Sequence, residues 1–136
     1  LLIPMNINLI KFLSKLKNAS ISKQEVISTD YNNLCLAVVK LLYKEGFIQS
    51  FSIKKVSFNS NVELKIFITL RYFNNKPIFK NLRIVSTPSR LNYLNIKDLS
   101  KISNKKIVLI LSTNKGLLTS LECKKHKIGG KLLFAL

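Results

Sequence analysis

The segment IVLILSTNKGLLTSLECKKHKIGG, from Ile107 to Gly130, joins an apolar run, a hydroxyl-rich stretch, a helix signal and a glycine pair among lysines. Ile107–Leu111 has the length and composition of a buried strand. Thr119-Ser-Leu-Glu122 has capping-box spacing, in which the hydroxyl and the carboxylate each meet a backbone N–H. The segment therefore predicts a strand, a connection, a short helix to about Lys127 and a final strand KLLFAL at residues 131–136.

The connection carries hydrogen-bonding side chains, one positive charge and one glycine, namely Ser112, Thr113, Asn114, Lys115 and Gly116. A glycine lets a ligand backbone approach closely, and the N-terminus of the helix capped by Thr119 attracts phosphate. Folded RNA presents phosphates, 2′-hydroxyls and base edges that such a loop can bind. An ordinary strand-to-helix connection explains the same residues equally well.

The first half of the chain predicts a capped helix among strands. Asn32 is a suitable N-cap, apolar residues follow at helical spacing, and Gly46 ends the helix. Strands are predicted at SKQEVIST (22–29), FSIKKVSF (51–58) and VELKIFITLRYF (62–73), the last with the period-2 alternation of a half-buried strand.

The opening LLIPMNINLIKFLSKLKNAS is basic and free of acids, with apolar residues at helical spacing at Leu9, Phe12, Leu13 and Leu16. This pattern fits an organellar transit peptide. A first structural helix explains it equally well.

Short strands and loops follow Phe79. Strands are predicted at KNLRIVS (80–86) and RLNYL (90–94), with a turn at Thr87-Pro88-Ser89 between them. We therefore expect two small α/β modules that meet near residues 76–82.

Two further groups of residues are candidates for RNA contact. Tyr93, beside Arg90, can stack on a base, although a buried strand aromatic is an equal alternative. Lys124, Lys125 and Lys127 can face phosphates, although a solvated helix face is the default for such a run.

The charge of the chain points to a polyanionic partner. In 136 residues, Lys and Arg total 23 against six acids, a formal net charge of +17. Nucleic acid relieves the self-repulsion because each neutralised phosphate releases counterions. An anionic membrane surface is the competitor, but no apolar run approaches the ~20 residues of a spanning helix. The abundance of Lys, Asn and Ile indicates an AT-rich gene, as in many organelles.

The sequence gives little support for an enzyme, a metal site or a cofactor. The S-x-x-K spacing of Ser112 and Lys115 recurs several times in this lysine-rich chain and carries no information. Phosphate-binding glycine motifs are absent and the acids are scattered, so no small-molecule substrate is expected. Cys35 and Cys123 are expected to be reduced packing thiols, and Cys123 with His126 supplies only two possible metal ligands.

The chain resembles the family of the bacterial-type small-subunit ribosomal protein number eight. The most specific match is Ser112–Thr119 with Gly129-Gly130-Lys131, which is similar to the family's S-T-S-x-G-[IV]-[ML]-T and G-G-E. Leu13–Ala19 resembles L-T-R-I-R-N-A, Leu36–Ile48 resembles a helix ending K-E-E-G-F-I, and Ser86–Tyr93 resembles S-[KR]-P-G-x-R-x-Y. Order and spacing hold over nearly the whole chain.

The resemblance implies an α+β fold of two modules. The N-terminal one, residues 1–78, would place two helices on a short three-stranded sheet. The C-terminal one, residues 79–136, would be β-rich with one short helix and carry the main RNA contact. Because Leu13–Ala19 aligns within the family's first helix, the resemblance favours a retained N-terminus over a cleaved transit peptide.

The implied function is structural and non-enzymatic. The protein would bind a helix in the central domain of small-subunit rRNA, contact neighbouring small-subunit proteins and support assembly and translation, without a membrane, cofactor or metal. The expected location is the mitochondrial ribosome, with a plastid as the second choice. The alternative is a stand-alone basic protein that binds RNA or a membrane surface outside the ribosome.

Several departures from the family pattern affect the expected site. Asn114 stands in place of serine, Cys123 in place of alanine, and Lys131 in place of glutamate, which reverses a charge. Ser89 and Leu91 replace glycine and arginine, which weakens any phosphate contact there. The expected RNA-contacting residues are Ser112, Thr113, Asn114, Lys115, Gly116, Thr119, Gly129, Gly130, Lys131, Tyr93, Arg90, Ser86 and Lys124.

Overall fold

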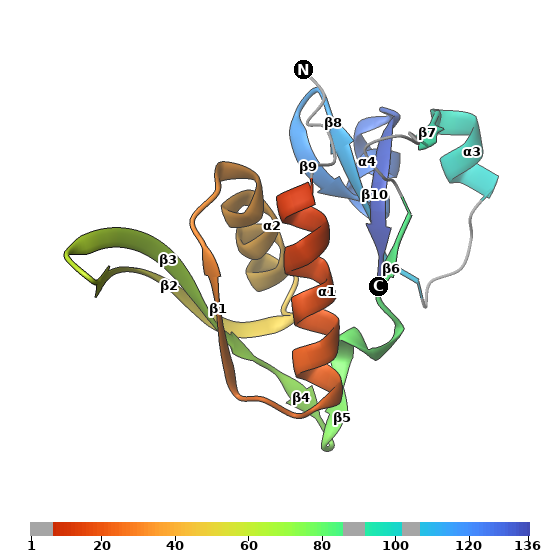
Figure 1. Ribbon diagram of the computed structural model, residues 1–136. Coiled ribbons are helices and arrows are strands. Elements are labelled where there is room, and N and C mark those ends of the chain that lie inside the picture. Colours follow the sequence, from red (N-terminus) through yellow and green to blue (C-terminus); the bar gives the residue numbers. More distant parts are fainter. Residues whose placement is uncertain (1–6, 86–91, 102–106) are drawn as a thin grey trace. The chain divides into compact units, whose positions relative to one another are not determined.

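The fold is described from a computed structural model, for residues 7–85, 92–101 and 107–136. The chain forms two compact units, which are described separately (Figure 1). The first is Lys11–Asn81, and the second is Leu82–Leu136 together with residues 7–10, which are the beginning of helix α1 (Ile7–Ile21); the rest of α1 belongs to the first unit.

The first unit contains two helices and an antiparallel three-stranded sheet in the order β1-β3-β2, as predicted. Its elements are α1 (Ile7–Ile21), β1 (Val26–Asp30), α2 (Asn33–Lys44), β2 (Ile48–Phe58), β3 (Asn61–Leu70), β4 (Tyr72–Phe73), β5 (Lys76–Pro77) and the 3₁₀ turn η1 (Ile78–Asn81).

Helix α1 confirms the helical interpretation of the acid-free opening. The apolar residues that set its periodicity are fully covered, whereas Lys11 and Lys15 are exposed. The covered residues are Leu9, Phe12, Leu13 and Leu16.

Helix α2 begins and ends at the predicted residues. The Asn32 side chain accepts a hydrogen bond from the backbone N–H of Leu34 at 2.9 Å, which satisfies one free donor of the first turn. At the other end Gly46 has φ +82°, and the N–H of Phe47 donates to the carbonyl of Leu42 at 2.9 Å. This left-handed glycine closes the helix with the bonding of a Schellman motif.

Strands β2 and β3 form a long hairpin through a tight turn at Asn59 and Ser60, both with positive φ. Two consecutive residues with positive φ are typical of a type I′ turn. The prediction of a half-buried β3 is correct only for its second half, because Val62 is 63% and Leu64 is 42% exposed. Strand β1 pairs with β3 only at residues 65–69, whereas β2 pairs with β3 as far as Asn61. Near the turn the hairpin is therefore a two-stranded ribbon without a third strand.

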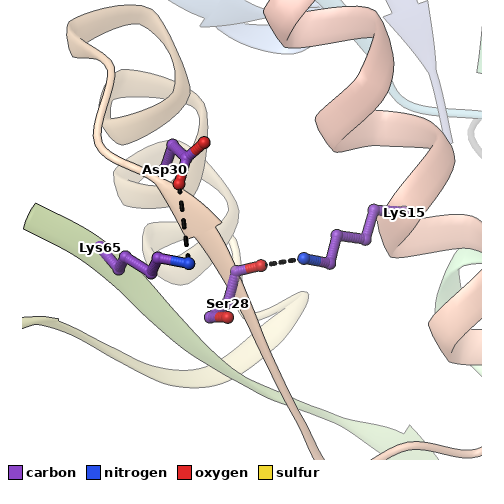
Figure 2. Close-up of polar contacts among 4 residues, drawn as sticks. All are labelled: Lys15, Ser28, Asp30 and Lys65. Atoms are coloured by element: carbon purple, nitrogen blue, oxygen red, sulfur yellow. Dashed lines mark hydrogen bonds and ion pairs between the residues drawn. The ribbon is translucent and has the colours of Figure 1, made fainter. Parts of the chain in front are cut away.

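The edge strand β1 is held by two lysines, as Figure 2 shows. The ammonium of Lys15 on α1 donates a hydrogen bond to the backbone carbonyl of Ser28. Lys65 on β3 lies 3.8 Å from the carboxylate of Asp30. The first contact occupies a backbone acceptor of an edge strand, which a further strand would otherwise be able to pair. The exposed ion pair contributes little to stability.

The second unit is β-rich, which confirms the α+β prediction. Its sheet runs in the order β6-β10-β8-β9, with β7 also paired to β10. Its elements are β6 (Arg83–Ile84), β7 (Asn92–Leu94), α3 (Ile96–Lys101), β8 (Leu109–Thr113), β9 (Gly116–Thr119), α4 (Ser120–His126) and β10 (Gly130–Ala135).

One face of this sheet packs against the two helices of the unit. The core there contains Leu111 and Leu132 from the sheet, Leu99 from α3 and Cys123 from α4. Cys123 is fully buried, so the expectation of a packing thiol is confirmed.

The structure differs from the sequence prediction at four places in this unit. Of the strand predicted at residues 80–86, only β6 (Arg83–Ile84) forms within the described residues, and residues 80 and 81 belong to η1. Helix α3 was not predicted, although Asn95 and Asp98 cap each other's backbone N–H groups at its start. The strand predicted at Ile107–Leu111 is β8, which continues to Thr113. The connection expected to lead directly into a helix contains a further strand, β9. The predicted turn at 87–89 lies outside the described residues.

Candidate RNA interface

Strand β10 brings three of the predicted residues into one row. In the antiparallel register, Lys131 pairs with Tyr93 of β7 on one side and with Ser112 of β8 on the other. Ser112 in turn pairs with Leu117 of β9. Side chains of directly paired residues lie on the same face of a sheet. The row Tyr93–Lys131–Ser112–Leu117 therefore crosses four strands on one face.

This row lies on the face opposite to α3 and α4. The neighbours Leu111 and Leu132 pack with those helices, and alternation along a strand turns Ser112 and Lys131 the other way. Tyr93 is 59% exposed, which excludes a buried aromatic and leaves its ring available for stacking. Lys131 is only 7% exposed. Ser112 is fully covered and has a polar or electrostatic interaction of its own.

A two-residue turn joins β8 to β9. Thr113 pairs with Gly116, so Asn114 and Lys115 form the tip, and both are exposed. The hydroxyl of Thr113 donates to the carbonyl of Gly116 at 2.8 Å and accepts from the N–H of Lys115 at 3.1 Å. Gly116 has φ +97°, and a Cβ there would meet nothing within 4 Å. This glycine is therefore required by the backbone conformation and not by crowding within the unit.

The predicted hydroxyls do not form one exposed group. Ser112 and Thr113 are consecutive strand residues, so their side chains point to opposite faces, and each is fully covered. Within the predicted connection Ser112–Gly116, only Asn114 and Lys115 are exposed.

The glycine pair allows close packing of neighbouring strands against the start of β10. A Cβ on Gly129 would lie 2.6 Å from the carbonyl oxygen of Leu94 and 3.3 Å from the Tyr93 hydroxyl. A Cβ on Gly130 would lie 2.7 Å from both the carbonyl oxygen of Ser112 and the Cγ2 of Thr113. Contacts below about 3 Å are not tolerated in a packed interior. Both glycines therefore have a structural reason within the chain.

Helix α4 is capped by the Thr119 hydroxyl, as predicted, whereas the Glu122 carboxylate lies beside that hydroxyl. The hydroxyl of Thr119 accepts from the N–H of Glu122 at 3.3 Å and lies 3.5 Å from its carboxylate. Lys127 ends the helix with φ 54°, and the N–H of Ile128 donates to the carbonyl of Cys123 at 3.1 Å. Lys124 is half-buried and belongs to this helix, which covers the sheet face opposite to the row.

Two of the predicted contacts, Arg90 and Ser86, lie outside the described residues. The sequence reasoning did not foresee β9 or the place of Leu117 in the row. The pattern Asn-Lys-Gly between two apolar runs is a hairpin signal that could have revealed both.

Other kinds of site find no support in the part of the chain described. Those residues contain no group of three or more His, Cys, Asp or Glu side chains able to hold a metal ion. Burial, with a contribution from Glu122, raises the pKa of Cys123 to about 11, and burial also raises the pKa of Cys35. Both thiols are therefore poor nucleophiles. No described helix has the length and apolar character needed to cross a bilayer.

Comparison with known proteins places the chain in a family. Residues 8–136 match ribosomal protein S8. "Small ribosomal subunit protein uS8m" of Acanthamoeba castellanii is 44% identical over 104 residues, which cover 75% of this chain and 76% of the relative. "Small ribosomal subunit protein uS8c" of Tupiella akineta is 36% identical over 123 residues, covering 89% and 90%. "Small ribosomal subunit protein uS8" of Pseudomonas paraeruginosa is 32% identical over 121 residues, covering 89% of each chain. With the shared order of motifs, these matches show that the chain belongs to the ribosomal protein S8 family.

Proposed function

We propose that the protein is a structural, non-enzymatic component of the small ribosomal subunit, in contact with rRNA and with neighbouring ribosomal proteins. The observation that carries this proposal is membership of the S8 family over residues 8–136. The net charge of +17 supports an RNA partner, since six acids cannot neutralise 23 basic residues within the chain.

Within the second unit, the surface proposed to contact rRNA is the end of the row formed by Tyr93 and Lys131, with the tip Asn114–Lys115; Ser112 is covered and supports this surface from within. Tyr93 offers an exposed ring, and the tip offers an amide and an ammonium on a hairpin whose shape Thr113 fixes internally. Stacking on an aromatic ring contributes about 1–3 kcal/mol per base. We also propose that the RNA bound by this surface is a helix of the central domain of the small-subunit rRNA.

The proposed location is the mitochondrial ribosome. The 44% identity to the A. castellanii relative supports it, and the T. akineta relative at 36% makes a plastid ribosome the second candidate. Fractionation of organelles with an antibody to this chain distinguishes the two.

Sedimentation after gentle lysis tests the ribosomal role. We expect the chain to cofractionate with small subunits and to leave them when the rRNA is digested. A pool that stays free or lipid-associated would favour the stand-alone basic protein. Crosslinking then tests the surface, with nucleotides attached to Tyr93 and Lys115 expected, and with crosslinks confined to Lys124 and Lys125 of α4 contradicting it.

A further inference from the structure

The hairpin of β2 and β3 extends beyond the third strand of its sheet, as Figure 1 shows. Along β3, alternate apolar residues change from covered to exposed toward the turn. Ile68 and Ile66 are fully covered, whereas Leu64 is 42% and Val62 is 63% exposed. Because alternate residues of a strand share a face, one apolar face runs from the core of the first unit out to the hairpin tip.

Strand β2 adds an apolar residue and a lysine to this face. Ile53 pairs with the covered Ile66 and is itself 43% exposed. Lys55 pairs with Leu64 and is exposed. Directly paired residues lie on the same face of a sheet. We call the surface formed by Ile53, Lys55, Val62 and Leu64 the hairpin face.

The composition of the hairpin face favours a protein partner over RNA. Three exposed aliphatic residues side by side form a patch of the kind that marks interaction sites, unlike apolar residues scattered singly. Aliphatic side chains offer neither a ring on which a base can stack nor a hydrogen-bond donor for a phosphate. A second copy of the chain is disfavoured, because two molecules with a net charge of +17 repel each other.

We propose that the hairpin face binds a neighbouring protein of the small subunit, through apolar side chains of that partner and a carboxylate that meets Lys55. This inference rests on the proposed function, and it assigns a contact with protein neighbours to the first unit. Covering Val62 and Leu64 would continue the core that Ile66 begins. The carboxylate follows from charge complementarity, because Lys55 stands beside apolar residues and would lose hydration when they are covered.

Cysteine labelling measures whether this face is covered, and by what. Val62→Cys is treated with a maleimide in the free chain, in the chain bound to small-subunit rRNA alone, and in small subunits assembled from that rRNA, the recombinant chain and the other subunit proteins. The native thiols of Cys35 and Cys123 are buried and should react slowly. Glu63→Cys is the matched control, because residue 63 is exposed and lies next to Val62 on the opposite face.

We expect Val62→Cys to react equally fast in the free chain and on rRNA alone, and about tenfold more slowly in the assembled subunit, because a protein interface excludes solvent. Glu63→Cys should react faster than Val62→Cys in the assembled subunit. Slow reaction of Val62→Cys on rRNA alone would mean that RNA covers the face. An unchanged rate in the assembled subunit would mean that nothing covers it, and either result refutes the proposal.

Two adjacent lysines test the carboxylate of the partner. Lys55→Glu reverses a charge on the hairpin face, and Lys54→Glu makes the same change on the opposite face. We expect Lys55→Glu to weaken incorporation into assembled subunits about tenfold more than Lys54→Glu, with similar affinities for rRNA alone. Equal incorporation of the two variants would contradict the carboxylate. Circular dichroism establishes that both are folded, because Lys54 also lies over the ring of Phe67.

Failure of this inference and failure of the proposed function give different results. Leu64→Ser should weaken incorporation about tenfold without weakening rRNA binding. If the wild type enters assembled subunits and a folded Leu64→Ser enters equally well, the hairpin face is refuted as a binding surface while the proposed function stands. If the wild type neither binds the rRNA nor enters the subunits, the proposed function itself fails.

Discussion

Replacing Gly130 by alanine should destabilise the second unit through a single steric conflict. An added Cβ would lie 2.7 Å from the carbonyl oxygen of Ser112, 2.7 Å from the Cγ2 of Thr113 and 3.3 Å from the Cβ of Leu111. The first of these atoms is backbone and belongs to the paired strand β8, so it cannot rotate away. The two strands must separate, and overpacking of this kind typically costs about 1–3 kcal/mol.

Gly116 provides a control, because its backbone conformation and not crowding favours glycine there. Its φ of +97° disfavours side chains, yet the space around its Cβ is open. Alanine there should cost about 1–2 kcal/mol through backbone conformation alone, and asparagine should cost less because it tolerates positive φ. At Gly130 asparagine should be worse than alanine because it is larger. The preferred residue thus differs between the two glycines.

Urea denaturation followed by circular dichroism measures these costs, and amide hydrogen exchange assigns them to β8 and β10. Reduced protection confined to those strands is expected for Gly130→Ala. Wild-type stability in Gly130→Ala, or the same ranking of alanine and asparagine at both glycines, would refute the close approach of β10 to β8.

Other residues give further expectations. Thr119→Ala should lower the unfolding free energy by about 1 kcal/mol in denaturation, because it removes the N-cap of α4, whereas Thr119→Ser should restore it. Lys115→Gln should reduce the salt slope of RNA binding by about 0.7–0.9, and an unchanged slope would mean that the tip does not meet a phosphate. Thr113→Val should destabilise the fold by about 1 kcal/mol, since the hydroxyl bonds within the turn; loss of RNA affinity at unchanged stability would contradict this. The pKa of Cys123 is raised to about 11, so the folded state is favoured while this thiol is protonated. This contribution to stability is present below pH 9 and is lost as the pH rises from about 9 through 11. Alkylation of Cys123 in the native protein at neutral pH should be slow, and rapid modification would contradict its burial.

The sequence was sufficient to predict an element where all of its signals lie within that element. Helix α2 has its N-cap Asn32, its apolar stripe and its terminating Gly46 within one short segment, and each of them was predicted correctly. Helix α1 is similar, because its buried residues follow a single period. In both cases the decisive interactions lie within a few turns of the same helix.

Elements whose structure depends on pairing with a distant segment were harder to predict from the sequence. Strand β9 has only four residues, and its last residue, Thr119, also caps α4, so the helix signal concealed the strand. The exposure of Val62 and Leu64 follows from the shortness of β1, which the alternation of β3 does not encode. The β8–β9 register fixes the two-residue turn at Asn114 and Lys115, which the pattern Asn-Lys-Gly between two apolar runs signals only as a possible hairpin.

The residues expected to contact RNA stay a prediction, and their arrangement in the fold differs from the grouping that sequence spacing suggested. Sequence spacing grouped the residues of the Ser112–Gly116 segment, whereas the fold groups Ser112 with Lys131 and Tyr93 across strands. That register is set by pairing between distant segments and shifts between Leu132 and Phe134, where β10 departs from regular pairing with β8. No local pattern carries this information.

The arrangement divides the predicted residues into two kinds with different consequences. The Thr113 hydroxyl donates its one proton to Gly116 and its side chain is fully covered, so we expect this residue to hold the turn and not to contact RNA. At Gly130, atoms of β8 fill the space that a side chain would need. Substitutions at such framework residues should lower stability and RNA affinity together. Tyr93 is exposed, so substitutions there should lower affinity with little loss of stability.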